Sequence, residues 1–322
     1  RPEVIWSTYP IATAHLIAGT LARLHRLPWV ADFRDWMTDK DYPDGALKRA
    51  LFRRIEKFVL SRSDAAVFTT EASRELYRER YGGLRSTNWT VLPNGYDEAD
   101  FRDTDTGHEV PSCNGDIVLL HSGYLYPQDR CPRALFEALA TLKGDGFLSG
   151  TRLIVRFRAP GDESHLRSEA SRFGVNDLVQ VMPAIPHKRA VNEMLKVNAL
   201  LLIQGPRFNR QVPAKAYEYL RSGRPILAMS PENSETNKIM SLAGKAYSAD
   251  MEASDAIARQ LRRLVLDIEK GKALKTRRAA ISKFERKRQA GELARIFSRV
   301  AAAGASNSPE LRPGLSRTDG SA

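Results

Sequence analysis

The chain has 322 residues, which is enough for two domains, and its 42% hydrophobic content is typical of globular proteins. No apolar run is long enough to span a bilayer. Fifty Lys and Arg against 38 Asp and Glu give a net charge of +12. This excess favours phosphorylated substrates, nucleic acid or anionic lipid as partners, but it does not choose among them.

The first part of the chain predicts α/β structure. Apolar patterns indicate strands at 4–7, 29–33 and 64–70, and helices at 12–24, 46–61 and 71–81. The segment Pro93-Asn94-Gly95 is a turn signal. No strand with a glycine-rich turn comes before residue 4. We therefore expect the first units of this domain to be missing from the chain.

The helix at 46–61 has an apolar stripe on one side and basic residues on its other faces. Leu47, Leu51, Ile55 and Phe58 lie along one side, and the remaining faces carry Lys48, Arg49, Arg53, Arg54 and Lys57. Such a helix can lie on an anionic membrane surface. Packing against a sheet is the commoner use of such a stripe, and it is the interpretation preferred here.

The polar stretch 102–116 lacks periodicity and is interpreted as a linker. After it, strands at 116–123, 151–159, 178–184, 199–205 and 224–230 alternate with helices. This alternation predicts a parallel, doubly wound sheet. Helices at 252–270 and 283–303 follow, and residues 305–322 have the Pro, Ser and Gly content of a disordered tail.

Two strand ends in this second part carry candidate binding residues, because ligands of open parallel sheets bind beyond the carboxyl ends of the strands. Gly123 ends the first strand, and Arg130 and Arg133 come shortly after it. Free amides, a helix N-terminus and arginines suit a pyrophosphate. A plain turn with surface arginines explains this stretch equally well.

The second strand end leads through Pro213 into a helix that carries Lys215 and Glu218. These two residues are three apart and so share a helix face. A lysine there can neutralise phosphate oxygens, and a carboxylate can accept hydrogen bonds from the hydroxyls of a ribose. On spacing alone, an exposed ion pair is the commoner explanation.

In the first part, Asp32, Arg34 and Asp35 lie at the carboxyl end of the buried strand 29–33. Three charges at that point indicate a cleft, and the alternative is an arginine–aspartate network that pins a loop. The two cysteines, Cys113 and Cys131, favour a reducing, cytoplasmic setting. The chain has no metal-ligand histidine spacing, Walker loop or GxGxxG, so we expect no metal and no nicotinamide cofactor.

Four stretches together resemble the GT-B glycosyltransferases of family 4, particularly bacterial members that build cell-surface polysaccharides. They are "VPAKAYEYLRSGRPILA", "VLPNGYDEADF", "PWVADFRDW" and "HSGYLYPQDRCPRALFEAL". The likeness implies two Rossmann-like domains that face a cleft. Residues 1–108 would be a partial acceptor domain with its linker, and 109–282 the nucleotide-sugar domain. Residues 283–304 would be a helix that crosses back, and 305–322 a disordered tail.

The resemblance also implies roles for single residues. Glu218 would bind the donor ribose, Lys215 and Arg130 the diphosphate, and Gly123 would allow close backbone approach. The three charged residues Asp32, Arg34 and Asp35 would face the reacting sugar and the acceptor. The sequence departs from the family where Arg210 replaces a glutamate, where Pro183 replaces a common glycine, and at the missing first strand.

The implied reaction is a metal-independent transfer with retained anomeric configuration, from a nucleoside-diphosphate sugar to a glycan or lipid-linked acceptor at the inner membrane face. The leaving phosphate, stabilised by cations and a helix dipole, takes the acceptor's proton. Three alternatives stay open: a GT-B epimerase or hydrolase of nucleotide-sugars, a basic nucleic-acid-binding protein, and an inactive fragment or partner. Aromatic residues do not cluster with basic ones, so we expect no nucleic-acid partner.

Overall fold

The computed structural model describes residues 2–40, 42–84, 88–102, 115–126, 129–150, 153–242, 244, 247–274 and 276–306. The chain forms two compact units. Unit 1 comprises Arg1–Phe68, Arg78–Thr90 and Glu292–Ala322, and unit 2 comprises Thr69–Tyr77 and Val91–Gly291. Most of the predicted linker, 103–114, and the predicted tail from 307 onward lie outside the described residues.

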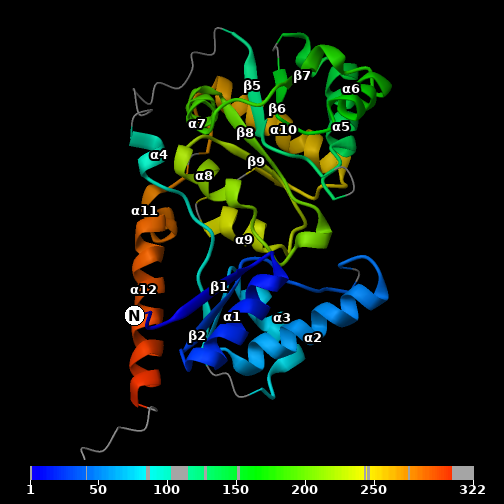
Figure 1. Ribbon diagram of the computed structural model, residues 1–322. Helices are drawn as coiled ribbons and strands as arrows, with labels where there is room; N and C mark the ends of the chain where they lie inside the picture. Colours follow the sequence, from blue (N-terminus) through cyan, green and yellow to red (C-terminus); the bar gives the residue numbers. More distant parts are fainter. Residues whose placement is uncertain are drawn as a thin grey trace, which may run out of the picture. The chain divides into compact units, whose positions relative to one another are not determined.

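Unit 1 is built on a sheet with the strand order β1-β2-β3-β4 (Figure 1). Its elements are β1 (Ile5–Tyr9), α1 (Ala12–His25), β2 (Trp29–Phe33), α2 (Ala46–Arg62), β3 (Ala65–Phe68) and β4 (Trp89–Val91). The residues of α3 (Glu71–Tyr81) are divided between the two units. Strand β2 pairs in parallel with both β1 and β3, and all five of its residues are buried. A central parallel strand needs such an almost continuous apolar run, as the sequence predicted.

The amino-terminal half of α2 differs from the preferred interpretation. Ile55 is buried, as expected for a helix that packs on its sheet, and Phe58 is half-buried. Leu47 and Leu51 are 86% and 54% exposed, however, because the first turns of α2 extend past the residues that could cover them. Packing on the sheet is therefore right for the second half of the helix and wrong for the first.

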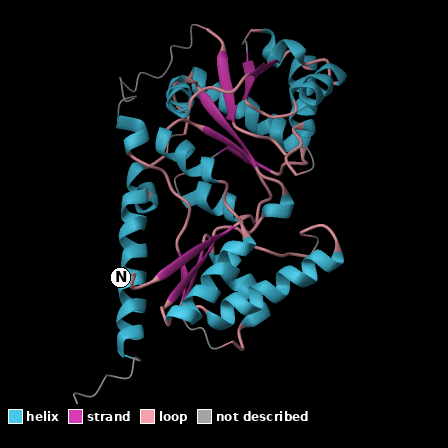
Figure 2. Ribbon diagram, viewed as in Figure 1, coloured by secondary structure: helices cyan, strands magenta, loops and turns pink. Residues whose placement is uncertain are grey.

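Unit 2 is built on a six-stranded sheet with the order β10-β9-β8-β5-β6-β7, shown in magenta in Figure 2. All five strand pairs are parallel. Numbered within the unit, this order is the one that defines the classic doubly wound nucleotide-binding sheet. The strands are β5 (Ile117–Ser122), β6 (Leu153–Arg158), β7 (Val179–Met182), β8 (Ala199–Ile203), β9 (Ile226–Met229) and β10 (Tyr247–Ala249).

Helices cover both faces of this sheet (Figure 1). One core contains residues of α5 (Arg133–Gly144), α6 (Glu163–Arg172) and α10 (Ser254–Glu269), and the other contains residues of α7 (His187–Lys196) and α8 (Ala214–Ser222). Successive strand residues enter opposite cores: Leu201 and Ile203 face the first, and Leu200 and Leu202 face the second. The period of two along a strand sends its apolar side chains to both sides.

Unit 2 also contains short elements that the apolar patterns did not predict. Besides β10, these are α4 (Ala99–Arg102) and α11 (Arg278–Ile281), while α9 (Glu235–Leu242) agrees with the predicted alternation. The helix α12 (Arg286–Ser306) agrees with the helix predicted at 283–303, and most of it belongs to unit 1. The turn at Gly95 is explained by a close approach. A Cβ atom at this position would lie 2.1 Å from the carbonyl oxygen of Phe284. The neighbouring Tyr96 amide donates to the same carbonyl at 3.1 Å.

Candidate donor-binding site

The strand order of unit 2 places its switch point between β5 and β8. Strands β6 and β7 follow on one side of β5, and β8, β9 and β10 lie on the other. Ligands of such sheets bind beyond the carboxyl ends of the strands at this point. Gly123 comes directly after β5, and Lys215 is the second residue of α8, the helix that follows β8. The topology thus brings together two residues that are far apart in the sequence.

Lys215 and Gly123 are in direct proximity. The lysine Nζ lies 3.1 Å from the position that a Cβ atom would occupy at residue 123. Gly123 has a φ of +99°, a backbone conformation that favours glycine. Its amide donates to the carbonyl of Arg158 at 2.8 Å, which fixes the loop after β5 against the end of β6. Any other residue at 123 would be strained and would crowd the amine.

His121 lies beneath this amine and was not identified as a site residue from the sequence. Its ring is fully buried, and its Nδ1 lies 3.0 Å from the carbonyl oxygen of Leu201. Because a carbonyl only accepts, Nδ1 carries the proton and Nε2 is the free acceptor. Lys215 Nζ lies 3.1 Å from this Nε2 and donates to it. The sequence feature that could have identified it is a histidine inside the apolar strand "DIVLLHSG".

Burial controls the charge of Lys215. The pKa of the amine is lowered to about 7, chiefly by burial and then by Arg130, while Glu218 acts in the opposite direction. Burial, together with Lys215 and Arg130, also holds the pKa of His121 well below its usual value, so the imidazole is neutral. The site therefore has an amine that changes its charge close to neutral pH.

Arg130 adds a second cation near Lys215. Its guanidinium carbon lies 5.2 Å from the centre of the Tyr126 ring. Burial lowers the pKa of Arg130, whereas Tyr126 and Asp129 raise it. Its Nε is buried and has no hydrogen-bond partner among the described residues. Arg133, the other arginine noted in the sequence, is the exposed first residue of α5.

Glu218 lies on the same face of α8 as Lys215. Both are half-buried, while the residues at 216, 217, 219 and 220 are buried in the core. Burial raises the pKa of Glu218, and nearby Asp100 also raises it, whereas His187, Arg286 and Lys215 lower it. The carboxylate is thus close to the amine and to a further mixed group of charges.

In unit 1, the three charged residues at the end of β2 differ in exposure. Asp32 is 2% exposed, Arg34 is half-buried and Asp35 is exposed. Arg34 Nη1 lies 3.8 Å from Asp32 Oδ2. Burial raises the pKa of Asp32 to about 6, and Arg34 lowers it. Asp32 Oδ1 has no hydrogen-bond partner among the described residues. Both the predicted cleft and the alternative loop-pinning network are compatible with these contacts.

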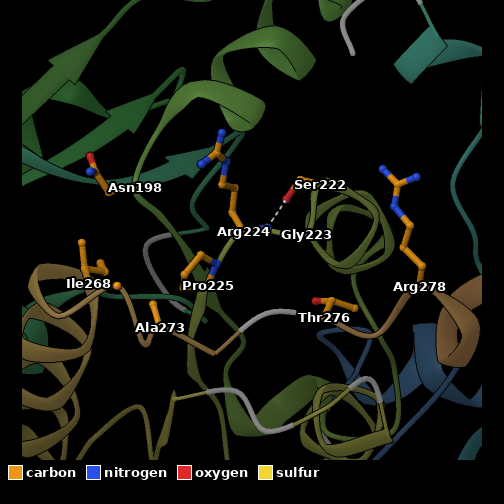
Figure 3. A pocket seen from close by; sticks show the side chains of 10 residues that line it. Asn198, Ser222, Gly223, Arg224, Pro225, Ile268, Ala273, Thr276 and Arg278 are labelled. Carbon is orange, nitrogen blue, oxygen red and sulfur yellow. Dashed lines mark hydrogen bonds between the residues drawn. The ribbon is translucent and has the colours of Figure 1, made fainter. Parts of the chain in front are cut away.

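A separate pocket of about 320 Å³ lies at the opposite edge of the unit 2 sheet (Figure 3). It is lined by Asn198, Ser222, Gly223, Arg224 and Pro225, which precede β8 and β9, and by residues that follow α10. Arg224 donates to the carbonyl of Leu195 at the end of α7. Helices α7, α8 and α10 end here, and their carbonyl ends carry partial negative charge. This pocket is poorly suited to a diphosphate.

No described group of histidine, cysteine, aspartate and glutamate side chains has an arrangement suited to a metal ion. Within the described part of the chain, none of the helices has the length and apolar character required to cross a membrane.

Comparison with known proteins shows which family model and which solved structures the chain is similar to. Residues 1–95 match the model of the glycosyl transferase 4-like domain. No curated protein matches the chain. Among solved structures, the chain is similar to HepE from Anabaena in complex with UDP-glucose, with 14% identity and a TM-score of 0.64. That match covers 94% of this chain and 79% of the HepE chain.

Two further structures share the fold. One is an α,α-trehalose-phosphate synthase (UDP-forming) from Burkholderia xenovorans in complex with glucose-6-phosphate, with 10% identity and a TM-score of 0.70, covering 92% of this chain and 75% of that one. The other is sucrose-phosphate synthase from Thermosynechococcus elongatus, with 12% identity and a TM-score of 0.66, covering 94% and 74%.

The chain therefore has the GT-B fold, with two parallel α/β sheets, and its first 95 residues match the model of the glycosyl transferase 4-like domain. The fold and the enzyme class predicted from the sequence, a GT-B glycosyltransferase, are confirmed. The roles of the individual site residues stay predictions.

Proposed function

We propose that the protein is a retaining glycosyltransferase that uses a nucleoside-diphosphate sugar as donor. One observation carries the proposal: a half-buried lysine amine lies beside a positive-φ glycine at the switch point of a doubly wound sheet. Such a place combines positive charge with close backbone approach, which are the two requirements of a diphosphate.

The solved structures indicate which donor to test first. HepE was obtained with UDP-glucose, and the trehalose-phosphate synthase is UDP-forming. We propose a uridine nucleotide-sugar as the donor class of this chain. Lys215 and Arg130 would bind the diphosphate, Gly123 would allow its approach, and Glu218 would accept hydrogen bonds from the ribose hydroxyls.

In the proposed reaction, the bond between the anomeric carbon and the diphosphate oxygen breaks, and a bond to the acceptor oxygen forms on the same face of the sugar. The proton of the acceptor hydroxyl passes to an oxygen of the departing diphosphate. Lys215 and Arg130 stabilise the negative charge that develops there, and they are in place before the reaction begins. These two cations supply charge that other enzymes take from a metal, so we propose a metal-independent transfer.

We further propose a glycan or lipid-linked acceptor of a cell-surface polysaccharide pathway, with Asp32, Arg34 and Asp35 near it. The exposed Leu47 and Leu51 on the basic helix α2 support peripheral contact with an anionic membrane. The low cysteine content supports a cytoplasmic location.

Calorimetric titration with UDP- and GDP-sugars tests the donor assignment. We expect Glu218→Ala to weaken binding about tenfold or more, because it removes hydrogen bonds to a charged group. The control is Glu137→Ala, which removes an exposed glutamate on α5 in the same unit. Absence of binding with every nucleotide-sugar would refute the proposal. If the protein hydrolysed or epimerised the donor in the absence of an acceptor, that reaction would replace sugar transfer as the assigned activity.

A further inference from the structure

His121 has a hydrogen-bonding arrangement with a defined direction. Its Nδ1–H donates to the Leu201 carbonyl, so its Nε2 can only accept, and Lys215 is the donor. The imidazole is fully buried, and its ring centre lies 6.0 Å from that of Phe157, with the two planes tilted by 45°. Strand β5 thus provides a rigid, neutral acceptor for Lys215 at the switch point.

We propose that His121 is a positioning residue, which holds the amine of Lys215 beside Gly123 so that a donor diphosphate binds together with a proton from solvent. This inference rests on the proposed function and names a residue and a proton that the function alone does not require. His121 touches neither donor nor acceptor in this account, because Lys215 lies between it and the ligand.

The geometry explains why Lys215 needs a hydrogen-bond acceptor at His121. An ammonium group has three N–H donors and no acceptor. One N–H of Lys215 is directed to His121 Nε2, which leaves two for phosphate oxygens. A long, flexible lysine side chain loses much rotamer freedom when it is held in place. The hydrogen bond to the imidazole orders the Lys215 amine before the ligand arrives. The positive-φ residue Gly123 leaves the space beside this amine open.

The charges around Lys215 explain why it takes up a proton when the donor binds. Arg130, from the loop after β5, opposes protonation of Lys215, and Glu218, from α8 itself, favours it. His121, from β5, is neutral and adds no charge. Glu218 is in turn influenced by three more groups outside α8, which are His187, Asp100 and Arg286.

Burial and Arg130, against the opposite effect of Glu218, give the amine a pKa of about 7, so a substantial fraction is neutral at neutral pH. A bound diphosphate favours the charged form by its opposite charge, and the amine takes up a proton.

Calorimetry with UDP-glucose measures this proton directly. The two phosphates of UDP-glucose are diesters whose charge is constant around neutral pH, so they contribute no proton of their own. Titrations in buffers of different ionisation enthalpy should show uptake of nearly one proton per donor at about pH 8 and almost none at about pH 6. Lys215→Met should abolish this uptake, and the control Glu137→Ala, an exposed residue of α5, should retain it.

Two His121 variants separate positioning from packing. Asn places its amide near Nδ1, so His121→Asn keeps the contact to Leu201 and loses the acceptor for Lys215. Gln reaches toward the place of Nε2, so His121→Gln retains an acceptor for the amine. We expect about tenfold weaker UDP-glucose binding for the Asn variant and binding within about twofold of wild type for Gln. In the Lys215→Met background, His121→Asn should have no further effect.

A second measurement does not depend on nucleotide binding. In protein labelled at the ε-carbon of lysine, NMR titration reports the protonation of Lys215, assigned by its loss in Lys215→Met. Its midpoint should lie near pH 7 in wild type, lower in His121→Asn, and near the wild-type value in His121→Gln. Both variants should keep the wild-type circular dichroism.

The outcomes distinguish the two proposals. If no nucleotide-sugar binds, the proposed function fails, and this inference fails with it. If UDP-glucose binds but the midpoint of Lys215 is the same in wild type and in the Asn and Gln variants, the inference alone is overturned. An effect of His121→Asn that is equally large in the Lys215→Met background would likewise overturn it, because it would then be a packing effect.

Discussion

Asp32 combines almost complete burial with a carboxyl group that has one distant cationic partner. It is 2% exposed, and the nearest guanidinium nitrogen of Arg34 is 3.8 Å away. Removing a carboxylate from water without hydrogen bonds disfavours its charge, which is why its pKa rises to about 6. The protein retains this residue at a cost in stability, as is common for functional sites.

This cost predicts a pH dependence of stability. The folded-state pKa of about 6 exceeds the ordinary value of 3.8, so the contribution of Asp32 is fully present below about pH 4 and is lost as the pH rises through 6. Asp32→Asn removes this loss. Relative to wild type, we expect the free energy of unfolding of the variant to increase by on the order of 3 kcal/mol between about pH 4 and pH 7.

Urea unfolding at a series of pH values measures this difference. His15, whose pKa burial lowers to about 4, titrates in the same range, but it is present in both proteins and cancels. Glu79→Gln, which changes an exposed carboxylate on α3, serves as the control. A difference between Asp32→Asn and wild type that does not vary with pH would contradict the expectation.

The sequence identified some site residues better than others. The spacing of Lys215 and Glu218 placed them on one helix face, but only the family resemblance gave them binding roles, which stay predictions. Their companion His121 was not recognisable, because its significance depends on the neighbouring Leu201 carbonyl and on an amine 94 positions later in the chain. Long-range pairs of this kind have no local pattern.

At the scale of single elements, α2 shows the limits of an amphipathic pattern. The same stripe is buried at Ile55 and exposed at Leu47. Periodicity predicts which side of a helix is apolar, but it does not indicate how far the underlying structure extends along that side. The strand β10 was missed for a different reason, since three residues are too few for a pattern.

The exposed half of α2 leads to a prediction for membrane binding. Leu47→Ser with Leu51→Ser should reduce binding to anionic phospholipid vesicles at least tenfold, because each leucine contributes about 1.5–3 kcal/mol when buried. Co-sedimentation measures the bound fraction. Leu24→Ser is the matched control, because Leu24 is 70% exposed on α1. Equal binding of the double variant and wild type would refute this role, as would equally strong binding to neutral vesicles.

At the scale of the whole molecule, the positive net charge of +12 now has a more specific interpretation. Part of it lies where a nucleotide-sugar would need it, at Lys215 and Arg130 in unit 2. Another part lies on α2 in unit 1. The excess is therefore distributed over places suited to different anions, which composition alone did not distinguish.

The cationic site predicts that donor binding and transfer do not depend on a divalent metal. In the presence of excess EDTA, the affinity for UDP-glucose and the rate of transfer should stay within about twofold of their values in Mg²⁺, since the lysine and the arginine stabilise the diphosphate. Repeating the measurements in EDTA with Lys215→Met shows how much of this stabilisation the lysine provides. Loss of activity in EDTA that Mg²⁺ restores in wild type would contradict the prediction.

The sequence by itself determined the alternation of strands and helices, the class of fold and the residues on one face of α8, because these follow from local periodicity and spacing. Only the tertiary structure decided the strand order that places the switch point between β5 and β8, the buried histidine beneath the lysine, and the uncovered half of α2. Each of these depends on which distant segments come together and exclude water, and no local pattern of residues carries that information.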